Sequence, residues 1–439
     1  MAVESLQPSR VADATHHNFP MTLSRCLFYL GLFGTSFLSI RAGSVTTGDI
    51  LLLMSAAALV VLAAARKIGS DGGLSPAWTA GTLLVLLGGT IAAVHALDFG
   101  THMLMVGRFA FLLIGLPWMA QVLADTPRRL LVAATWWAAG AGVSGAGAIV
   151  QAAIGSNIPG LEAGVRNAAI GRYTGFTDNV SDLGAVACGG LVLAVALFVR
   201  GRLPWLMLPI LGGCAAGMIL SGSVSSLLAV IVGGFIIVLR GRPKLAPSLV
   251  LVAAGVAMLA AVLQVQSDNP NALTIRQRIE QVTGRHNYVP SESAAVQNTL
   301  ATRAEVNRLG LDRGLDSPVG VGLDPASGGI ALDVGVTLEP HDIFINALYR
   351  GGWLMALGLL LVLGSAVRQG WSLARGSVGS AVYAAMMAEL AFALTSPSMI
   401  ARYVWIPVVL VLAAVNLQKS SPAEAHQAGS PVIELARWR

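Results

Sequence analysis

Long apolar stretches separated by short polar segments make up most of this chain. A helix needs about 20 apolar residues to cross the roughly 30 Å of bilayer hydrocarbon. Twelve stretches approach this length, at 22–40, 48–65, 77–97, 101–123, 129–153, 181–199, 203–221, 224–239, 246–265, 343–366, 377–396 and 400–417. The pattern predicts an all-α polytopic membrane protein with about 12 transmembrane helices.

One long polar segment, residues 266–342, interrupts this series between the ninth and tenth stretches. It must lie outside the hydrocarbon, because lipid cannot form hydrogen bonds with an exposed backbone. The predicted organisation is therefore a tail at 1–21, spans one to nine within 22–265, the large loop at 266–342, spans ten to twelve within 343–417, and a second tail at 418–439. We expect the loop to carry the active site.

Composition supports the membrane assignment. The chain has 55% hydrophobic and only 11% charged residues, whereas about a quarter of the residues in an average soluble domain are charged. Its mean hydropathy is +0.71.

Basic residues set the expected orientation, because cytoplasmic loops of membrane proteins are enriched in Lys and Arg. With the N-terminus inside, the inner loops contain Arg66, Lys67, Arg128, Arg129, Arg200, Arg202, Arg240, Arg242, Lys244, Arg368 and Arg375. Both tails are then cytoplasmic and the large loop is extracytoplasmic. These flanking cations account for the net charge of +6 without a nucleic-acid partner.

Two predicted outer loops contain arginines suited to phosphate recognition. The loop between spans five and six includes Arg172 beside Tyr173, and residues 266–339 of the large loop contain six arginines, no lysine and nine acidic residues. Arginine presents a planar fork that matches phosphate oxygens in pairs. Because acidic residues outnumber arginines in the large loop, some of these arginines are expected to pair with acidic neighbours instead.

Arg108 lies within the fourth predicted span. A charged side chain there costs about 2.5–3.5 kcal/mol on insertion scales, so it should face protein or water. Two interpretations stay open: it lines an outward-facing cavity, or it forms a structural pair with a carbonyl or carboxylate.

His341 is placed where the large loop returns to the membrane, after Pro340 and before a predicted helix. An imidazole with an ordinary pKa near 6.5 can accept a proton at neutral pH. The alternative is that His341 caps the helix and anchors it at the headgroup level. Within the loop we expect helices over 272–282 and from Ser291 to about Leu309, with Gly310, Gly314, Gly320 and Gly322 ending regular structure.

Three motifs resemble the bacterial O-antigen ligase and polymerase superfamily of membrane glycosyltransferases. They are the stretch from Gly171 to Asn179 (GRYTGFTDN), the turn Pro318–Gly322 (PVGVG) with Arg303 upstream, and the segment from His341 to Gly352 (HDIFINALYRGG). The expected twelve-span plan with one large loop between spans nine and ten is also the plan of that family. The sequence departs from the family's pattern at Asp342, where Asn is usual, and at Val224, where Arg is common.

The resemblance implies a GT-C-like enzyme in the inner membrane of a Gram-negative bacterium. Such an enzyme transfers polysaccharide from undecaprenyl pyrophosphate to lipid A–core on the periplasmic side, in lipopolysaccharide biosynthesis, without metal, nucleotide sugar or other cofactor. By this resemblance we expect His341 to act as general base and Arg172, Arg303 and Arg108 to bind the donor pyrophosphate. Asp342, Asn346 and Tyr173 are expected to support them.

Two alternatives to a ligase remain at this point. An O-antigen polymerase or a protein O-oligosaccharyltransferase uses the same donor with another acceptor. A secondary transporter is a more remote alternative, since transporters commonly show repeated halves and no repeat is visible here.

Overall fold

The computed structural model describes residues 9–42, 45–65, 73–154, 172–202, 204–240, 300–324, 329–331, 337–397 and 399–420. The helices are α1 (Ser9–Gly34), α2 (Thr47–Ala64), α3 (Pro76–His95), α4 (Phe99–Ala110), the π-helix η1 (Phe111–Gly115), α5 (Leu116–Leu123), α6 (Pro127–Ile154), α8 (Val180–Val199), α9 (Pro204–Ser221), α10 (Val224–Arg240), α14 (Leu300–Asp316), α15 (Ile343–Trp371), α16 (Val378–Ala393) and α17 (Arg402–Ser420). Two short antiparallel hairpins, β1 (Arg41–Ala42) with β2 (Val45–Thr46) and β3 (Ile330–Ala331) with β4 (Thr337–Leu338), complete the described elements.

This is an all-α architecture of membrane-protein type. Within the described residues, seven helices are long and apolar enough to cross a bilayer, and α9, α10 and α16 add shorter apolar helices. Eleven of the predicted spans fall on these helices or on α1, and the predicted span 246–265 lies outside the described residues. The number of crossings and their orientation stay predictions.

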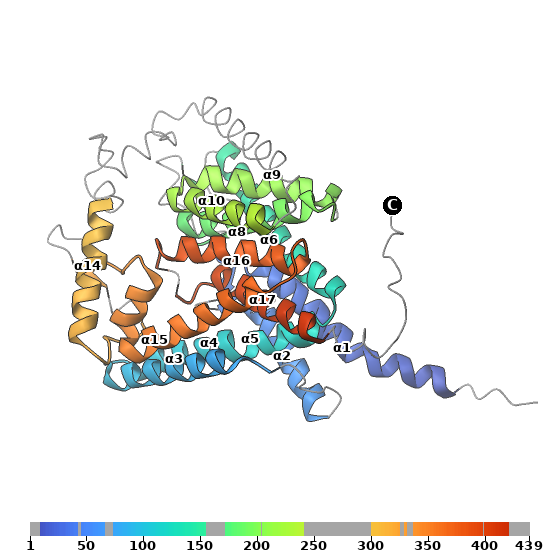
Figure 1. Ribbon diagram of the computed structural model, residues 1–439, viewed down its shortest axis with the longest axis horizontal. Helices are drawn as coiled ribbons and strands as arrows, with labels where there is room; N and C mark the ends of the chain where they lie inside the picture. Colours follow the sequence, from blue (N-terminus) through green and yellow to red (C-terminus); the bar gives the residue numbers. More distant parts are fainter. Residues whose placement is uncertain are drawn as a thin grey trace, which may run out of the picture.

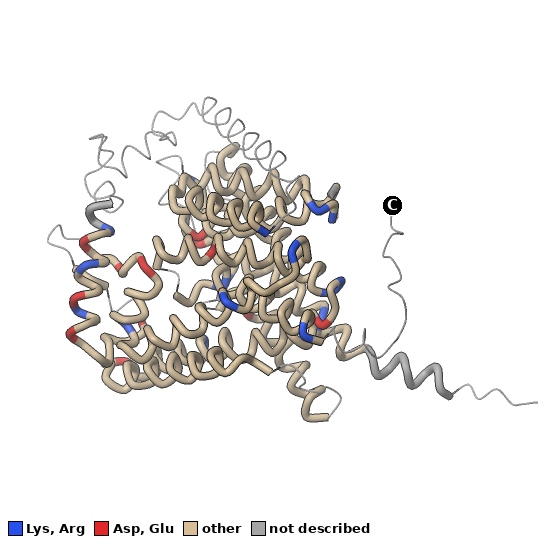
Figure 2. The backbone as a smooth tube through the Cα atoms, in the orientation of Figure 1, with Lys and Arg blue, Asp and Glu red and all other residues tan. Residues whose placement is uncertain are grey.

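The helices pack side by side, and α14 runs across one end of them (Figure 1). Charged residues are sparse on most of the packed helices, whereas α14 carries both signs along its length (Figure 2). The composition of residues 300–316 favours an amphipathic loop helix across the ends of the apolar helices over a further span.

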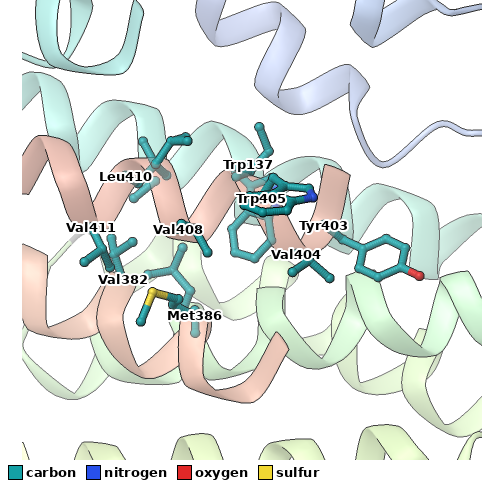
Figure 3. Close-up of a cluster of buried hydrophobic side chains, with 14 of the residues drawn as sticks. Trp137, Val382, Met386, Tyr403, Val404, Trp405, Val408, Leu410 and Val411 are labelled. Carbon is teal, nitrogen blue, oxygen red and sulfur yellow. The ribbon is translucent and has the colours of Figure 1, made fainter. Parts of the chain in front are cut away.

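Small residues allow the helices to approach closely. An added Cβ at Gly145 of α6 would lie 2.0 Å from the carbonyl oxygen of Gly213 in α9, and one at Gly81 of α3 would lie 2.7 Å from that of Gly358 in α15. Such backbone contact is typical of membrane helices, where association depends on van der Waals packing. Larger side chains fill the centre, among them Trp137, Met386, Trp405 and Val408 (Figure 3).

The predicted end of the second loop helix is wrong, and so is the expectation that Gly310 and Gly314 end regular structure. Helix α14 does not end near Leu309 but continues through Gly310 and Gly314 to Asp316. The two glycines lie on the face that contacts the start of α15, where added Cβ atoms would lie 2.7 Å from Pro340 and 2.8 Å from Leu348. Tight packing between helices, and not chain termination, therefore explains these glycines. The predicted helix 272–282 lies outside the described residues.

Helix α15 is broken at Gly352, whose φ of 72° and ψ of −170° are not helical. The turn Pro318–Gly322 docks into this break: Val321 N–H donates to the Tyr349 carbonyl (3.0 Å), Gly322 N–H to that of Arg350 (2.9 Å), and Trp353 N–H to that of Pro318 (3.1 Å). The glycine-rich motif thus forms a tight turn, as expected, and fixes the first nine residues of α15 as a separate short helix.

Gly352→Ala should lower the stability of the protein by at least about 1–3 kcal/mol, because a side chain at this positive φ is strained and its Cβ would lie 2.1 Å from the Pro318 carbonyl oxygen. Gly364→Ala in the same helix is the matched control, since an added Cβ there meets nothing within 4 Å. Thermal unfolding of both variants in detergent micelles checks this. Equal melting temperatures would contradict a role for the break.

Candidate functional site

His341 is held at the corner between α14 and α15. Its backbone N–H donates to the Asn307 side-chain oxygen (2.6 Å), so α14 fixes its position from one side. Asp342 caps α15, its Oδ1 accepting hydrogen bonds from the N–H groups of Phe344 (2.8 Å) and Ile345 (3.1 Å). The capping role weighed for His341 therefore belongs to Asp342, and the His341 side chain is available for another role.

Among the predicted pyrophosphate ligands, Arg303 is the one whose charge acts on His341 in the described part of the protein. Burial and, to a smaller extent, the positive charge of Arg303 lower the pKa of His341 to about 4, although a hydrogen bond with the Glu339 backbone acts in the opposite direction. Burial also lowers the pKa of Arg303. The imidazole is consequently neutral at pH 7 and lies beside a guanidinium group.

Polar atoms of this pair are left unsatisfied by the described part of the protein. The Nδ1 of His341 and the Nε of Arg303 are both buried, and neither has a hydrogen-bond partner among the described residues. Because buried polar atoms are nearly always hydrogen-bonded, such atoms indicate a place where a ligand or water supplies the missing partners.

A second layer of polar residues supports this corner. Arg350 is buried and forms an ion pair with Glu339 (2.8 Å), and its Nη1 donates to the Asp324 carbonyl (2.7 Å). Asn346 donates to the other Glu339 carboxylate oxygen (3.2 Å). The segment that carries His341 is thereby attached both to α15 and to the turn after α14.

Asn307, Glu339 and Arg350 are residues of this corner that the sequence pattern did not predict. The sequence did contain a signal for Arg350. Like Arg108, it is a charged residue within a predicted span (343–366), where it should face protein or water. Asn307 follows Arg303 by four residues, which places both on one face of α14.

Arg172 and Tyr173 are positioned by other helices. The Nε of Arg172 donates to the Ser221 carbonyl (2.7 Å), and the Tyr173 N–H donates to that of Leu220 (3.0 Å), both at the end of α9. These contacts tie Arg172 to the end of α9, whereas Arg303 and His341 lie between α14 and α15. The structure brings Arg303 to His341, and it anchors Arg172 to the end of α9.

Arg108 lines a cavity of about 540 Å³ that is bounded by α2, α4, η1, α17 and the segments before α2 and α8. This volume is within the range of about 300–1,000 Å³ found for small-molecule sites. The charged residues of its lining are Arg41, Asp49, Arg108, Asp178, Asp182 and Arg402. Arg108 thus lines a cavity, and the side of the membrane to which this cavity opens stays a prediction.

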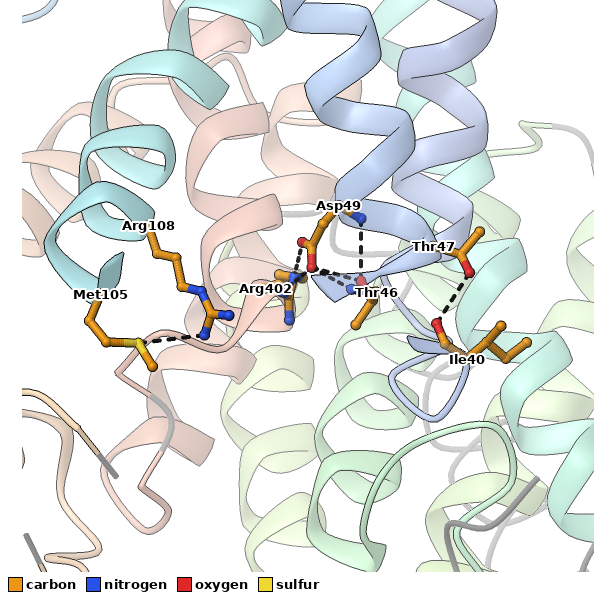
Figure 4. Close-up of polar contacts among 7 residues, drawn as sticks. All are labelled: Ile40, Thr46, Thr47, Asp49, Met105, Arg108 and Arg402. Carbon is orange, nitrogen blue, oxygen red and sulfur yellow. Dashed lines mark hydrogen bonds and ion pairs between the residues drawn. The ribbon is translucent and has the colours of Figure 1, made fainter. Parts of the chain in front are cut away.

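Most of these charges are arranged in pairs. Arg402 forms a bidentate ion pair with Asp49 (Figure 4), and Arg41 pairs with Asp178 (2.8 Å). Asp182 accepts a hydrogen bond from the Tyr403 hydroxyl (3.1 Å). The Nη1 of Arg108 contacts the Met105 sulfur (3.5 Å), and its guanidinium is directed towards Arg402 and Asp49 (Figure 4).

Helix α4 connects the two sites. His102 near its start accepts a hydrogen bond at Nδ1 from the N–H of Leu323 (2.7 Å), in the segment that Arg350 also holds. Arg108 follows six residues later, about 9 Å along the helix axis, and faces the cavity. The corner at His341 and the cavity are therefore joined by one rigid element.

Acidification should destabilise the protein through His341. Its folded-state pKa of about 4 lies below the ordinary 6.5, so the unfolded state binds more protons between these values and stability falls as the pH drops through that window. His341→Gln, which stays neutral, should lose less stability between pH 6.5 and 4. Melting temperatures of both proteins across this range test the expectation, and parallel curves would contradict it.

No family model and no curated protein sequence matches this chain.

Proposed function

We propose that the protein is a membrane glycosyltransferase, an O-antigen ligase that transfers polysaccharide from undecaprenyl pyrophosphate to lipid A–core at the periplasmic face of the inner membrane. The observation that carries this proposal is the neutral, buried imidazole of His341 beside the guanidinium of Arg303, each with a buried nitrogen that lacks a partner among the described residues. A base next to an anion-binding group is what transfer from a pyrophosphate carrier requires.

The proposed reaction is a direct displacement. A hydroxyl oxygen of the acceptor sugar forms a bond to the anomeric carbon of the donor, and the bond from that carbon to the pyrophosphate oxygen breaks with inversion. The imidazole of His341 takes the hydroxyl proton, and the bonding electron pair leaves with undecaprenyl pyrophosphate. General bases of this kind typically contribute a rate factor of about 10²–10⁴.

Arginines stabilise the leaving group in this proposal. Arg303 is the nearest candidate, since its charge acts on His341 directly. Removing one preorganised donor to a developing anion costs about 2.7–4 kcal/mol in other enzymes. Arg172 is the second proposed ligand, and its attachment to the end of α9 implies that the donor extends from the α14–α15 corner towards that helix end.

Arg303→Ala should reduce transfer by about 10²–10³-fold, the loss typical of removing one such donor. Arg308→Ala is the matched control, because Arg308 lies on the same helix but is exposed and paired with Asp312 (3.4 Å). The amount of polysaccharide attached to lipid A–core is measured in a ligase-deficient strain that expresses each variant, and it is normalised to the level of the protein. Equal losses in the two variants would argue against a specific role for Arg303.

Purified protein in nanodiscs distinguishes a ligase from its alternatives. The protein is incubated with lipid-linked O-antigen in three separate reactions, which contain lipid A–core, a second lipid-linked donor or an acceptor protein. Transfer to lipid A–core is the expected result. Growth of the lipid-linked chain would identify a polymerase, and modification of the acceptor protein would identify an oligosaccharyltransferase. Absence of transfer to all three would overturn the proposal.

A further inference from the structure

We propose that the cavity around Arg108 is a binding site for a neutral, hydroxyl-rich saccharide, and that Arg108 recognises sugar hydroxyls there instead of pyrophosphate. The inference rests on the proposed function only for the source of the saccharide, which is either the acceptor core or the donor glycan. The cavity itself is separate from the corner that contains His341.

The charge balance of the cavity argues against an anionic ligand. Three guanidinium groups and three carboxylates line it, and two of the arginines are already paired, Arg402 with Asp49 and Arg41 with Asp178. A site for pyrophosphate would be expected to present an excess of one sign, since clefts lined by like charges are those that concentrate counter-ions. Here the ion pairs of Asp49 with Arg402 and of Asp178 with Arg41 offset most of the positive charge that would attract a multiply charged phosphate.

The chemistry of the lining suits a saccharide. Carboxylates accept hydrogen bonds and guanidinium groups donate several in one plane, so adjacent groups of both kinds match the donor and acceptor character of neighbouring sugar hydroxyls. Asn179 and Tyr403 add further polar groups to this lining. The ring of Phe111 and several leucines supply the apolar surface against which the C–H face of a sugar ring packs.

The backbone at the wall of the cavity is also irregular. Phe111 and Leu112, which line the cavity, belong to the π-helix η1 between α4 and α5. Single π-helical turns within α-helices occur frequently at functional sites. Here the wider turn places Phe111 on the cavity wall one helical turn after Arg108.

The cavity lies at one end of the helical bundle, where a saccharide would reach it. Its lining includes the hairpin residues Arg41 and Val45, the loop residues Asp178 and Asn179, and Ala401 just before α17. These all lie in segments that connect helices, at the end of the bundle where α2, α8 and α17 begin. Helix α4 then links this rim to the turn at Leu323 that supports the His341 corner.

Direct binding tests the inference. Full-length protein in nanodiscs is titrated with three probes: a neutral hexose oligosaccharide of the outer core, a neutral soluble O-antigen oligosaccharide, and sodium pyrophosphate. We expect one of the two saccharides to bind and Arg108→Gln to weaken that binding at least tenfold. Asp178→Ala is a second variant that should also weaken binding, and its substitution is at the exposed rim instead of in a buried position. Arg308→Ala is the control and should bind the saccharide normally.

The saccharide that binds identifies the source: core oligosaccharide assigns the cavity to the acceptor, and O-antigen oligosaccharide assigns it to the donor glycan. Failure of both to bind wild-type protein would overturn the inference, as would pyrophosphate binding that Arg108→Gln abolishes. Because binding is measured without turnover, the result is independent of the proposed reaction. Loss of transfer in His341→Ala together with unchanged saccharide binding in Arg108→Gln and Asp178→Ala would refute the cavity proposal alone.

Discussion

Replacing His341 with alanine is expected to reduce glycan transfer by about 10²–10⁴-fold, the usual contribution of a general base. The alanine variant loses the imidazole but keeps the backbone N–H that donates to Asn307. It also keeps Asp342 as the cap of α15. The corner between α14 and α15 should therefore stay folded while the proton acceptor is gone.

The measurement is complementation of a ligase-deficient strain, with lipopolysaccharide analysed by gel and protein level determined in the same membranes. His95→Ala is a suitable control, because His95 is exposed at the end of α3 and its Nδ1 contacts only the Ile91 carbonyl of its own helix among the contacts described (2.8 Å). A well-expressed His341→Ala protein that still modified lipid A–core normally would exclude His341 as the base.

The second large effect concerns stability. Arg350→Ala should destabilise the protein by about 3–5 kcal/mol, the cost of removing one partner from a buried ion pair. The Arg350 side chain is only 2% exposed and that of Glu339 only 24% exposed, so the substitution leaves a carboxylate largely shielded from water. It also removes the hydrogen bond to the Asp324 carbonyl, which helps to hold the turn after α14.

Thermal unfolding in detergent micelles measures this effect. Arg129→Ala is the matched control, since its ion pair with Asp125 is exposed (side chains 36% and 41%) and exposed pairs contribute only about 0–1 kcal/mol. The double variant Arg350→Met/Glu339→Gln should recover part of the loss, because no charge is then left without a partner. If Arg350→Ala and Arg129→Ala melted at the same temperature, the supporting role of the pair would be refuted.

The helices could be predicted from the sequence because an apolar stretch of sufficient length is a local signal. Each stretch such as 181–199 or 400–417 is apolar enough by itself to require burial or lipid, and helix α8 or α17 follows at nearly the same residues. The start of α15 was equally local, since Pro340 and Asp342 mark a helix entry and Ile343 is its first residue. The break at Gly352 could not be predicted in this way, because it depends on the turn Pro318–Gly322 earlier in the chain.

The amino-acid sequence by itself determined that this is a helical membrane protein and that His341 enters on a rigid element, because hydropathy and capping act within a few residues. Only the tertiary structure decided which arginine lies beside that histidine and which faces a separate, charge-balanced cavity. The glycines of α14 illustrate the reason, since Gly310 has a packing role only once Pro340 lies against it. Proximity between residues far apart in the chain depends on how helices pack, and no local pattern specifies that packing.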